Sequence, residues 1–299
     1  MRGQATVPKS RTTAQAQSRW RTLASGARRY PLLFVGVSLA TVIVVVGLLA
    51  PWITPYPHDA GSATHATAAL QSPGAHHWFG TDLVGRDVLT RVVHGARVSL
   101  AIAIFVLLIA AVVGLTVGLT AGFVGGKVDT LLMRITDVFL AFPALLLSVA
   151  LSAVLTASAT SAVVAISATW WPWYARLSRA QAAAIRRTGY CDAARVIGAS
   201  RSRQLWRHVL PNAATPVFVQ MSLDAAGIIL TAATLSYLGL GAQDPTPEWG
   251  LMVSQGQSLA TTAWWVVTFP GLAIVLTAIA FNFIGDGLQT AFDPKRARR

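Results

Sequence analysis

The chain carries no charged side chain from Val138 to Ala175. As an α-helix rising about 1.5 Å per residue, this stretch would be nearly twice as long as the roughly 30 Å hydrocarbon core of a bilayer. Such a run has to turn back on itself inside lipid, and the small polar residues of Thr156–Ser161 are the expected place. The low charge content supports a membrane setting, because 12% of the residues are charged against about 25% in soluble domains.

Several other runs are long enough to cross a bilayer, which takes about 20 apolar residues in a helix. Leu32–Ile53 and Val98–Gly126 are free of charge. The remaining spans are expected from near Leu131, from Ala162 into the aromatic cluster at 170–174, across 213–240, and across 263–287. The sequence therefore predicts an all-α, polytopic membrane protein with six transmembrane helices.

The distribution of basic residues tests this arrangement. With the N-terminus in the cytosol, all 24 Lys and Arg residues except Arg86, Arg91 and Arg97 lie on the cytosolic side, as the positive-inside rule requires. The net charge of +13 is then a signal of topology, and no nucleic-acid partner is expected. The predicted order is a basic cytosolic tail (1–30), a first span (31–53), an extracytoplasmic segment (54–97), a five-helix core (98–290) with a cytosolic loop (186–212), and a basic cytosolic tail (291–299).

Four glycines recur at every fourth position of the second span, at Gly114, Gly118, Gly122 and Gly126. Residues at this spacing lie on one face of a helix. Small residues let helix backbones approach closely within a membrane. The pattern predicts a tightly packed helix and does not distinguish between functions.

A few charged residues interrupt the apolar segments. Arg134 and Asp137 are three residues apart near the cytosolic end of the third span, and we expect a mutual ion pair, with a proton relay as the alternative. Asp224 lies well inside the fifth span, where it either faces the translocation path or pairs with a partner subunit. The loop Gly239–Ser254 contains acidic residues and no basic one. It forms either an acidic lip that receives a partner or ligand, or a plain connection.

No catalytic constellation stands out. His76 and His77 are adjacent, but no third or fourth ligand has suitable spacing, and a solvated loop is the favoured interpretation. Cys191 is the only cysteine and gives no CxxC pattern. We therefore expect no catalytic residue, no metal site and no cofactor bound by this chain.

The basic loop between the fourth and fifth spans has a recognisable pattern. Asp192-Ala193-Ala194, then Gly198, then Leu210-Pro211 resemble the Glu-Ala-Ala, Gly, Leu-Pro signature of the EAA loop of ABC-importer permeases. The one departure is Asp192, where the family usually has Glu. In that family the loop is a short helical hook that fits a groove on a separate ATPase.

Further matches extend the resemblance over roughly residues 31–295. Phe79-Gly80-Thr81-Asp82, Gly85-Arg86-Asp87, Leu140-Ala141-Phe142-Pro143 and Pro247-Glu248-Trp249-Gly250 are similar to segments of the C-type permeases of dipeptide, oligopeptide and nickel importers. The resemblance implies the type I ABC-importer permease fold and a multi-pass protein of the cytoplasmic (inner) membrane.

The resemblance also implies a complex. Such permeases pair with a second, homologous permease subunit, so that this chain forms half of a pore for short peptides. Two ABC ATPase subunits use ATP and Mg on the cytosolic side, and an external binding protein delivers the substrate. The Arg-rich flanks of the loop can contact acidic ATPase surface or anionic lipid headgroups. Alternatives are import of nickel, glutathione or another small solute, and an ion-coupled secondary transporter, for which Asp224 is the one convincing buried acid.

Overall fold

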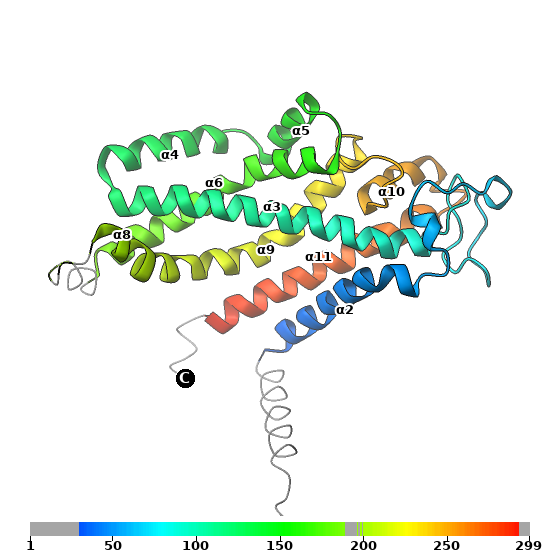
Figure 1. Ribbon diagram of the computed structural model, residues 1–299, viewed down its shortest axis with the longest axis horizontal. Helices are drawn as coiled ribbons and strands as arrows, with labels where there is room; N and C mark the ends of the chain where they lie inside the picture. The colour runs from blue at the N-terminus through cyan, green and yellow to red at the C-terminus, as the bar shows by residue number, and fades with distance from the viewer. Residues whose placement is uncertain (1–29, 189–195, 197, 199, 293–299) are drawn as a thin grey trace, which may run out of the picture.

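The computed structural model describes residues 30–188, 196, 198 and 200–292. This part of the chain is helical and contains no strand, apart from one isolated bridge between Thr81 and Asp87. Its main helices are α2 (Pro31–Ile53), α3 (Val88–Val124), α4 (Gly126–Leu140), α5 (Ala144–Val154), α6 (Ala159–Arg186), α9 (Leu210–Tyr237), α10 (Trp249–Gly256) and α11 (Trp265–Phe292). The long helices run side by side along one axis (Figure 1), and the all-α prediction is confirmed.

The number of membrane spans is close to the prediction of six. Four helices in the described part of the chain are long and apolar enough to cross a bilayer, and the bent pair α4–α5 makes a fifth candidate. The remaining predicted span corresponds to α6, which is apolar in its first half and carries Arg176, Arg179 and Arg186 in its second half. The turn predicted at Thr156–Ser161 is present, because α5 ends at Val154 and α6 begins at Ala159.

The third span is broken, although the sequence suggested a continuous helix from near Leu131. Helices α4 and α5 meet at an angle of 85°. The break falls at Ala141–Pro143, directly before α5. Proline disfavours helical geometry in the residue before it and cannot donate a helical hydrogen bond, which explains why the chain turns here.

The predicted glycine face of α3 packs against α6. A Cβ at Gly114 would lie 2.5 Å from the Cβ of Tyr174 and 2.7 Å from the carbonyl oxygen of Trp171. One turn further, a Cβ at Gly118 would collide with the Ala175 carbonyl oxygen and the Ser178 hydroxyl. That hydroxyl donates a hydrogen bond of 3.1 Å to the carbonyl oxygen of Gly114. The two backbones are therefore in direct contact along this face.

The hydrophobic core lies where α3, α6 and α9 meet. Val106, Ile166, Ile228 and Leu235 are fully buried there. Helix α2 lies at the edge of the bundle beside α11 (Figure 1), and it buries only small residues. Its large side chains point outward, as at Leu48, which is 58% exposed. An outward apolar surface of this kind is suited to lipid.

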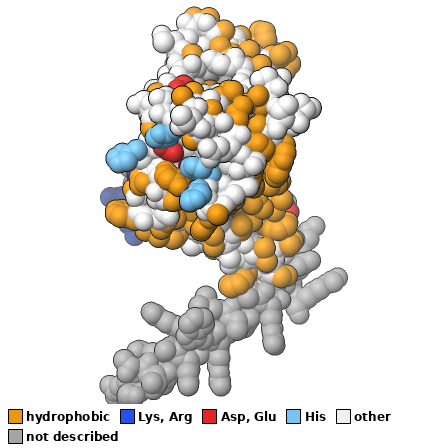
Figure 2. Space-filling model, turned by 90° about the vertical axis from the view of Figure 1, so that its right-hand side faces the viewer, with side chains coloured by type: hydrophobic (Ala, Val, Ile, Leu, Met, Phe, Trp, Pro, Cys, Tyr) orange, Lys and Arg blue, Asp and Glu red, His pale blue; other side chains and the backbone are white. Residues whose placement is uncertain are grey.

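The end of the bundle near residues 54–87 is built from short elements. Helix α3 begins at Val88, ten residues before the apolar run, and at 37 residues is about 55 Å long. It is therefore longer than a bilayer core, and its first turns belong to the polar end, which also contains η1 (Pro57–Ala60) and η2 (Ala66–Ala68). Figure 2 views this end, where histidine and acidic side chains are visible and Lys and Arg appear at the margin.

Candidate functional site

The described residues of the predicted coupling loop (186–212), namely 186–188, 196, 198 and 200–212, lie at the opposite end of the bundle, which we call the hook end. Asp192, Ala193 and Ala194 lie outside the described residues. Gly198 is exposed and has a φ of 80°. Apart from its neighbours in the chain, no heavy atom of the described residues lies within 4 Å of the place where its Cβ would be. Glycine adopts such a φ without steric cost, so backbone conformation and not packing calls for glycine here.

Leu210 and Pro211 lie inside a continuous helical stretch and not at the end of a loop. The chain is helical from α8 (Arg201–Gln204) through the π-helical turn η3 (Leu205–Val209) into α9. A proline ring clashes with the carbonyl four residues earlier in an ordinary α-helix. The π turn directly before Pro211 is a local departure from α-helical geometry at the position where the proline enters the helix. The part of the loop from residue 201 onward, which we call the second arm of the hook, is thus the first part of a helix long enough to span the membrane.

This arm is anchored to the bundle by apolar packing. Val209 is fully buried in a cluster with Leu119 of α3, Ala182 of α6 and Ala213 of α9. Leu205 packs against the same cluster. The second arm of the hook is therefore in direct contact with α3 and α6, as well as continuous with α9.

Two ion pairs tie α4 to α6 near this end. Arg179 binds both carboxylate oxygens of Asp129, at 2.6 and 2.7 Å. Asp137 accepts a bond of 2.7 Å from Nη2 of Arg176. The expected pair of Arg134 with Asp137 is not formed in the described residues, because the α4–α6 packing brings a cation from another helix to Asp137. Arg134 is exposed.

Asp224 lies at the contact between α9 and α6. Its Oδ1 accepts a hydrogen bond of 2.9 Å from Nε2 of Gln220, one turn earlier on α9. Tyr174 of α6 is fully buried and lies beside the carboxylate, although its hydroxyl is not placed for a well-formed hydrogen bond. The carboxylate is thus held among polar groups of this chain, with no basic partner among the described residues.

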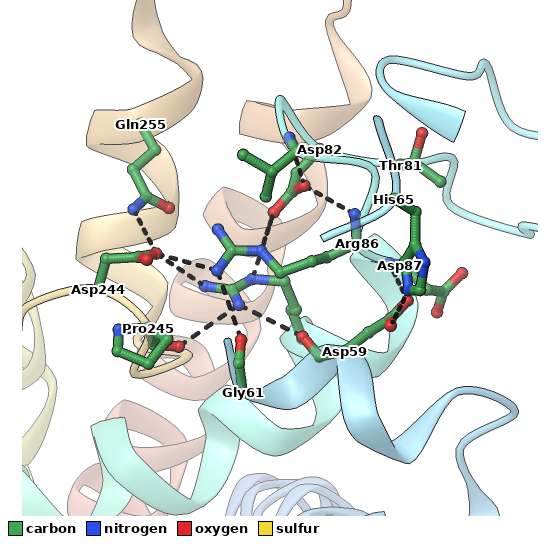
Figure 3. A network of polar contacts seen from close by, with 12 residues as sticks. Asp59, Gly61, His65, Thr81, Asp82, Arg86, Asp87, Asp244, Pro245 and Gln255 are labelled. Carbon is green, nitrogen blue, oxygen red and sulfur yellow. Dashed lines mark hydrogen bonds and ion pairs between the residues drawn. The ribbon is translucent and has the colours of Figure 1, made fainter. Parts of the chain in front are cut away.

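A dense polar network occupies the end opposite the hook (Figure 3). Asp82 binds Nε of Arg86 through Oδ2 at 2.7 Å and the backbone N–H of Arg86 through Oδ1 at 2.8 Å. Arg91, on the first turn of α3, is 1% exposed and lies 3.7 Å from the same carboxylate. Both guanidinium groups also face Asp244 of the loop between α9 and α10, at 3.1 Å for Arg86 and 4.0 Å for Arg91. Two segments distant in sequence, residues 82–91 and the loop that contains Asp244, meet at these charges.

Two further carboxylates order the same region. Asp87 caps α3 by accepting from the backbone N–H of Thr90 at 2.8 Å, and its other oxygen lies 2.9 Å from Nδ1 of His77. Asp59 accepts from the backbone N–H of Asp87 at 2.8 Å and lies 2.9 Å from Nε2 of His65. The side chain of His77 is 15% exposed, so it is part of this network and is not solvated as expected. No cluster of three potential metal-binding side chains occurs in the described residues.

The acidic loop after α9 packs against the start of α3. Glu248 is 1% exposed and caps α10 by accepting from the backbone N–H of Leu251 at 2.8 Å. Its other oxygen accepts a bond of 3.0 Å from the hydroxyl of Ser99. Trp249 donates from Nε1 to the carbonyl oxygen of Val92 at 2.9 Å. The segment is a fixed structural element and not a plain connection.

Removing the Glu248 carboxylate should weaken the contact between the segment before α10 and helix α3. In Glu248→Ala the N–H of Leu251 and the hydroxyl of Ser99 lose their acceptor, and we expect a loss of about 1–3 kcal/mol in stability. Glu248→Gln keeps one amide oxygen as acceptor and should lose less. Thermal unfolding of the two purified variants in the same detergent checks the order, and equal losses would contradict the capping role.

The ionisation of Asp244 follows from its neighbours. Burial alone would raise the pKa of its carboxyl, but the hydrogen bond from Gln255 and the charges of Arg86 and Arg91 together hold that pKa below its ordinary value. A carboxyl with a lowered folded-state pKa stabilises the fold above its unfolded pKa and loses this effect as the pH falls through the folded value. The contact of Asp244 with the arginines therefore persists through neutral and mildly acidic pH.

Sequence reasoning assigned no role to these network residues. Asp82 and Arg86 lie in the segments that resemble the family, Arg91 appears only among the three arginines outside the cytosolic side, and Asp59 carries no signal. The sequence does contain one signal for this network. The chain is poor in charge, and the segment predicted to lie outside the membrane contains the three arginines that depart from the positive-inside pattern.

The arrangement of helices defines the class of protein. A chain of the MetNI methionine ABC transporter, solved in inward-facing conformations, superposes with a TM-score of 0.55 and covers 66% of this chain and 93% of that one. Identity is 20%, so the likeness concerns the fold: that of an ABC-importer permease. The protein is accordingly a multi-pass membrane protein.

Sequence comparison then gives the family. Residues 114–298 match the model of the binding-protein-dependent transport system inner membrane component, and the chain belongs to this family. It is 45% identical over 264 residues to the dipeptide transport system permease protein DppC of Escherichia coli K12, covering 87% of this chain and 88% of that one. It is 39% identical over 280 residues to DppC of Alkalihalophilus pseudofirmus, covering 94% and 91%.

Proposed function

We propose that this chain is the transmembrane permease subunit of an ATP-driven importer for short peptides. The substrate class comes from the relatives, which are named as dipeptide permeases. The structural observation that carries the proposal is the continuous helix from Ser202 to Tyr237. It joins the hook to the middle of the bundle without a flexible link, so force applied at the hook reaches the membrane.

In this proposal the complex contains a second, homologous permease, two ABC ATPases and an external binding protein. Closure of the ATPases on ATP displaces the hook and with it α9. Packing of Val209 against Leu119 and Ala182 passes the displacement to α3 and α6. The bundle then exchanges outward- and inward-facing states, a two-state change driven by different contacts in each state.

The hook end suits an acidic partner in the cytosol. Arg186, Arg187, Arg203 and Arg207 are exposed there. A polar cavity of about 620 Å³ where α3, α4 and α6 meet is lined by Arg186 and Arg187, together with the ion-paired Arg179 and Asp129. These cations can meet acidic ATPase surface or anionic lipid headgroups. With this end inside, both basic tails are cytosolic and segment 54–97 faces the external binding protein.

Asp224 remains the candidate for a polar group on the translocation path or at the contact with the second permease. Because Asp224 lies where α9 contacts α6, a movement of these helices relative to each other would change the polar groups around its carboxylate. No group of three or more potential metal ligands occurs in the described residues, and nickel stays the alternative substrate. ATP hydrolysis is assigned to the partner subunits, and this chain is not an enzyme in the proposal.

Uptake of labelled dialanine tests the proposal. The chain is produced with its partner subunits in cells that lack other dipeptide uptake, and the result is compared with a complex whose ATPases cannot hydrolyse ATP. We expect uptake only with active ATPases, and co-purification of the ATPases with the tagged permease. Uptake that continues with inactive ATPases and follows an ion gradient would instead support a secondary transporter, and uptake of labelled nickel without dialanine would overturn the peptide assignment.

A further inference from the structure

Arg86 and Arg91 present more hydrogen-bond donors than the described part of the chain supplies with acceptors. All contacts of Arg91 are long: 3.4 Å from Nη1 to the Asp59 carbonyl oxygen, 3.5 Å to that of Pro245, and 3.7 Å from Nε to Asp82. Its Nη2 is buried and forms no hydrogen bond. A buried guanidinium with an unpaired N–H group is costly, which indicates that an acceptor is missing beside it.

Asp244 supplies that acceptor poorly. Its contacts with Arg86, Arg91 and Gln255 all use the same oxygen, Oδ1. Two guanidinium groups side by side are suited to a carboxylate that uses both oxygens. The side chain of Asp244 is 54% exposed, against 6% for Arg86. Asp244 is therefore the member of the network that can leave its position at least cost (Figure 3).

A cavity of about 170 Å³ adjoins these groups. Its polar wall is formed by Asp82, Arg86, Arg91, Asp244 and Gln255. The remaining wall is apolar and includes Val88, Met252 and Val266. Two carboxylates balance two arginines here, so an added anion is accepted when Asp244 turns outward and leaves a net positive charge. The apolar wall then suits a short aliphatic group beside that anion.

We propose that this cavity binds the terminal carboxylate of a peptide substrate, and that Asp244 occupies the position of that carboxylate when no peptide is present. The inference rests on the proposed peptide importer and adds where the permease recognises its substrate. The peptide carboxylate bridges Arg86 and Arg91, and its last side chain lies against the apolar wall. Asp244 lowers the affinity by competing with the peptide carboxylate for the same donors, so that the peptide can dissociate from this site and continue through the permease.

Equilibrium binding to the purified complex in lipid nanodiscs, without binding protein or nucleotide, tests this site. The probes are dialanine, its C-terminal amide and acetate. We expect wild type to bind dialanine at least about tenfold more tightly than the amide, because the amide cannot pair with both guanidinium groups. Asp244→Asn removes the competing negative charge and should tighten dialanine binding about tenfold while leaving the amide unchanged.

Arg91→Gln should abolish the preference for dialanine over the amide. Arg97→Gln is the matched control, because Arg97 lies on the same helix but is exposed and outside the cavity. If Arg91→Gln does not assemble, Asp244→Asn alone decides the matter. Equal binding of dialanine and its amide, or no tightening in Asp244→Asn, would overturn the carboxylate site even if dialanine is transported. Acetate binding that tightens in Asp244→Asn, without dialanine binding, would overturn the peptide assignment instead.

Discussion

Gly198→Val is expected to reduce ATP-dependent peptide uptake about 5–30-fold. The φ of 80° at Gly198 is costly for any residue with a Cβ, and most of all for a β-branched one. A penalty of about 1–2 kcal/mol on the native turn lowers the equilibrium constant for the correctly formed hook by that factor. Uptake of labelled dialanine, together with the amount of ATPase that co-purifies, measures the effect.

Gly198→Asn provides the control for backbone conformation. Asparagine tolerates left-handed geometry better than other non-glycine residues, and the space around the position is open. We therefore expect Gly198→Asn to retain most of the uptake and most of the bound ATPase. Equal losses in the two variants would show that side-chain size matters here and not φ. Full uptake in Gly198→Val would remove the hook from the coupling mechanism.

Gly118→Ala should clearly destabilise the fold. The added methyl group would collide with the Ala175 carbonyl oxygen and the Ser178 hydroxyl on α6. Because a backbone atom cannot rotate away, the two helices have to separate. Overpacking of this kind typically costs about 1–3 kcal/mol, and here the separation also weakens the bond from Ser178 to Gly114. Thermal unfolding and the yield of folded protein in detergent measure the loss.

The same substitution at Gly271 is the matched control. Gly271 lies in α11, and apart from the neighbouring backbone of that helix no heavy atom of the described residues lies within 4 Å of the place where its Cβ would be. Alanine favours a helix interior over glycine by about 1 kcal/mol, so Gly271→Ala should leave stability unchanged or raise it slightly. A comparable loss in both variants would mean that α3 and α6 do not pack as closely as the glycine face indicates.

The elements that follow from local sequence were predictable. The turn near Thr156–Ser161 was expected because an uncharged run of that length cannot remain one span, and the glycine face of α3 was expected from its four-residue spacing. The bend between α4 and α5 was missed. The apolar run from Val138 hid the break, although Phe142-Pro143 carries the signal for it.

Features that depend on how the helices pack could not be predicted in the same way. Arg134 is near Asp137 in sequence, but the register of α4 against α6 brings Arg176 to that carboxylate. The site at Arg91 joins residues 154 positions apart, at the contact with Pro245. Such contacts require the fold first, because no periodicity within one segment encodes them.

The polar network also bears on how the chain enters the membrane. Segment 54–97 contains Asp59, Asp82 and Asp87 together with Arg86, Arg91 and Arg97, so its formal charge is zero with histidine neutral. Moving one elementary charge across a potential of 100 mV takes about 2.3 kcal/mol of electrical work. A segment with equal numbers of both signs does almost no net work against that potential. In the proposed orientation, with segment 54–97 outside, the carboxylates that position Arg86 and Arg91 would therefore also offset the electrical work of carrying these arginines across the membrane.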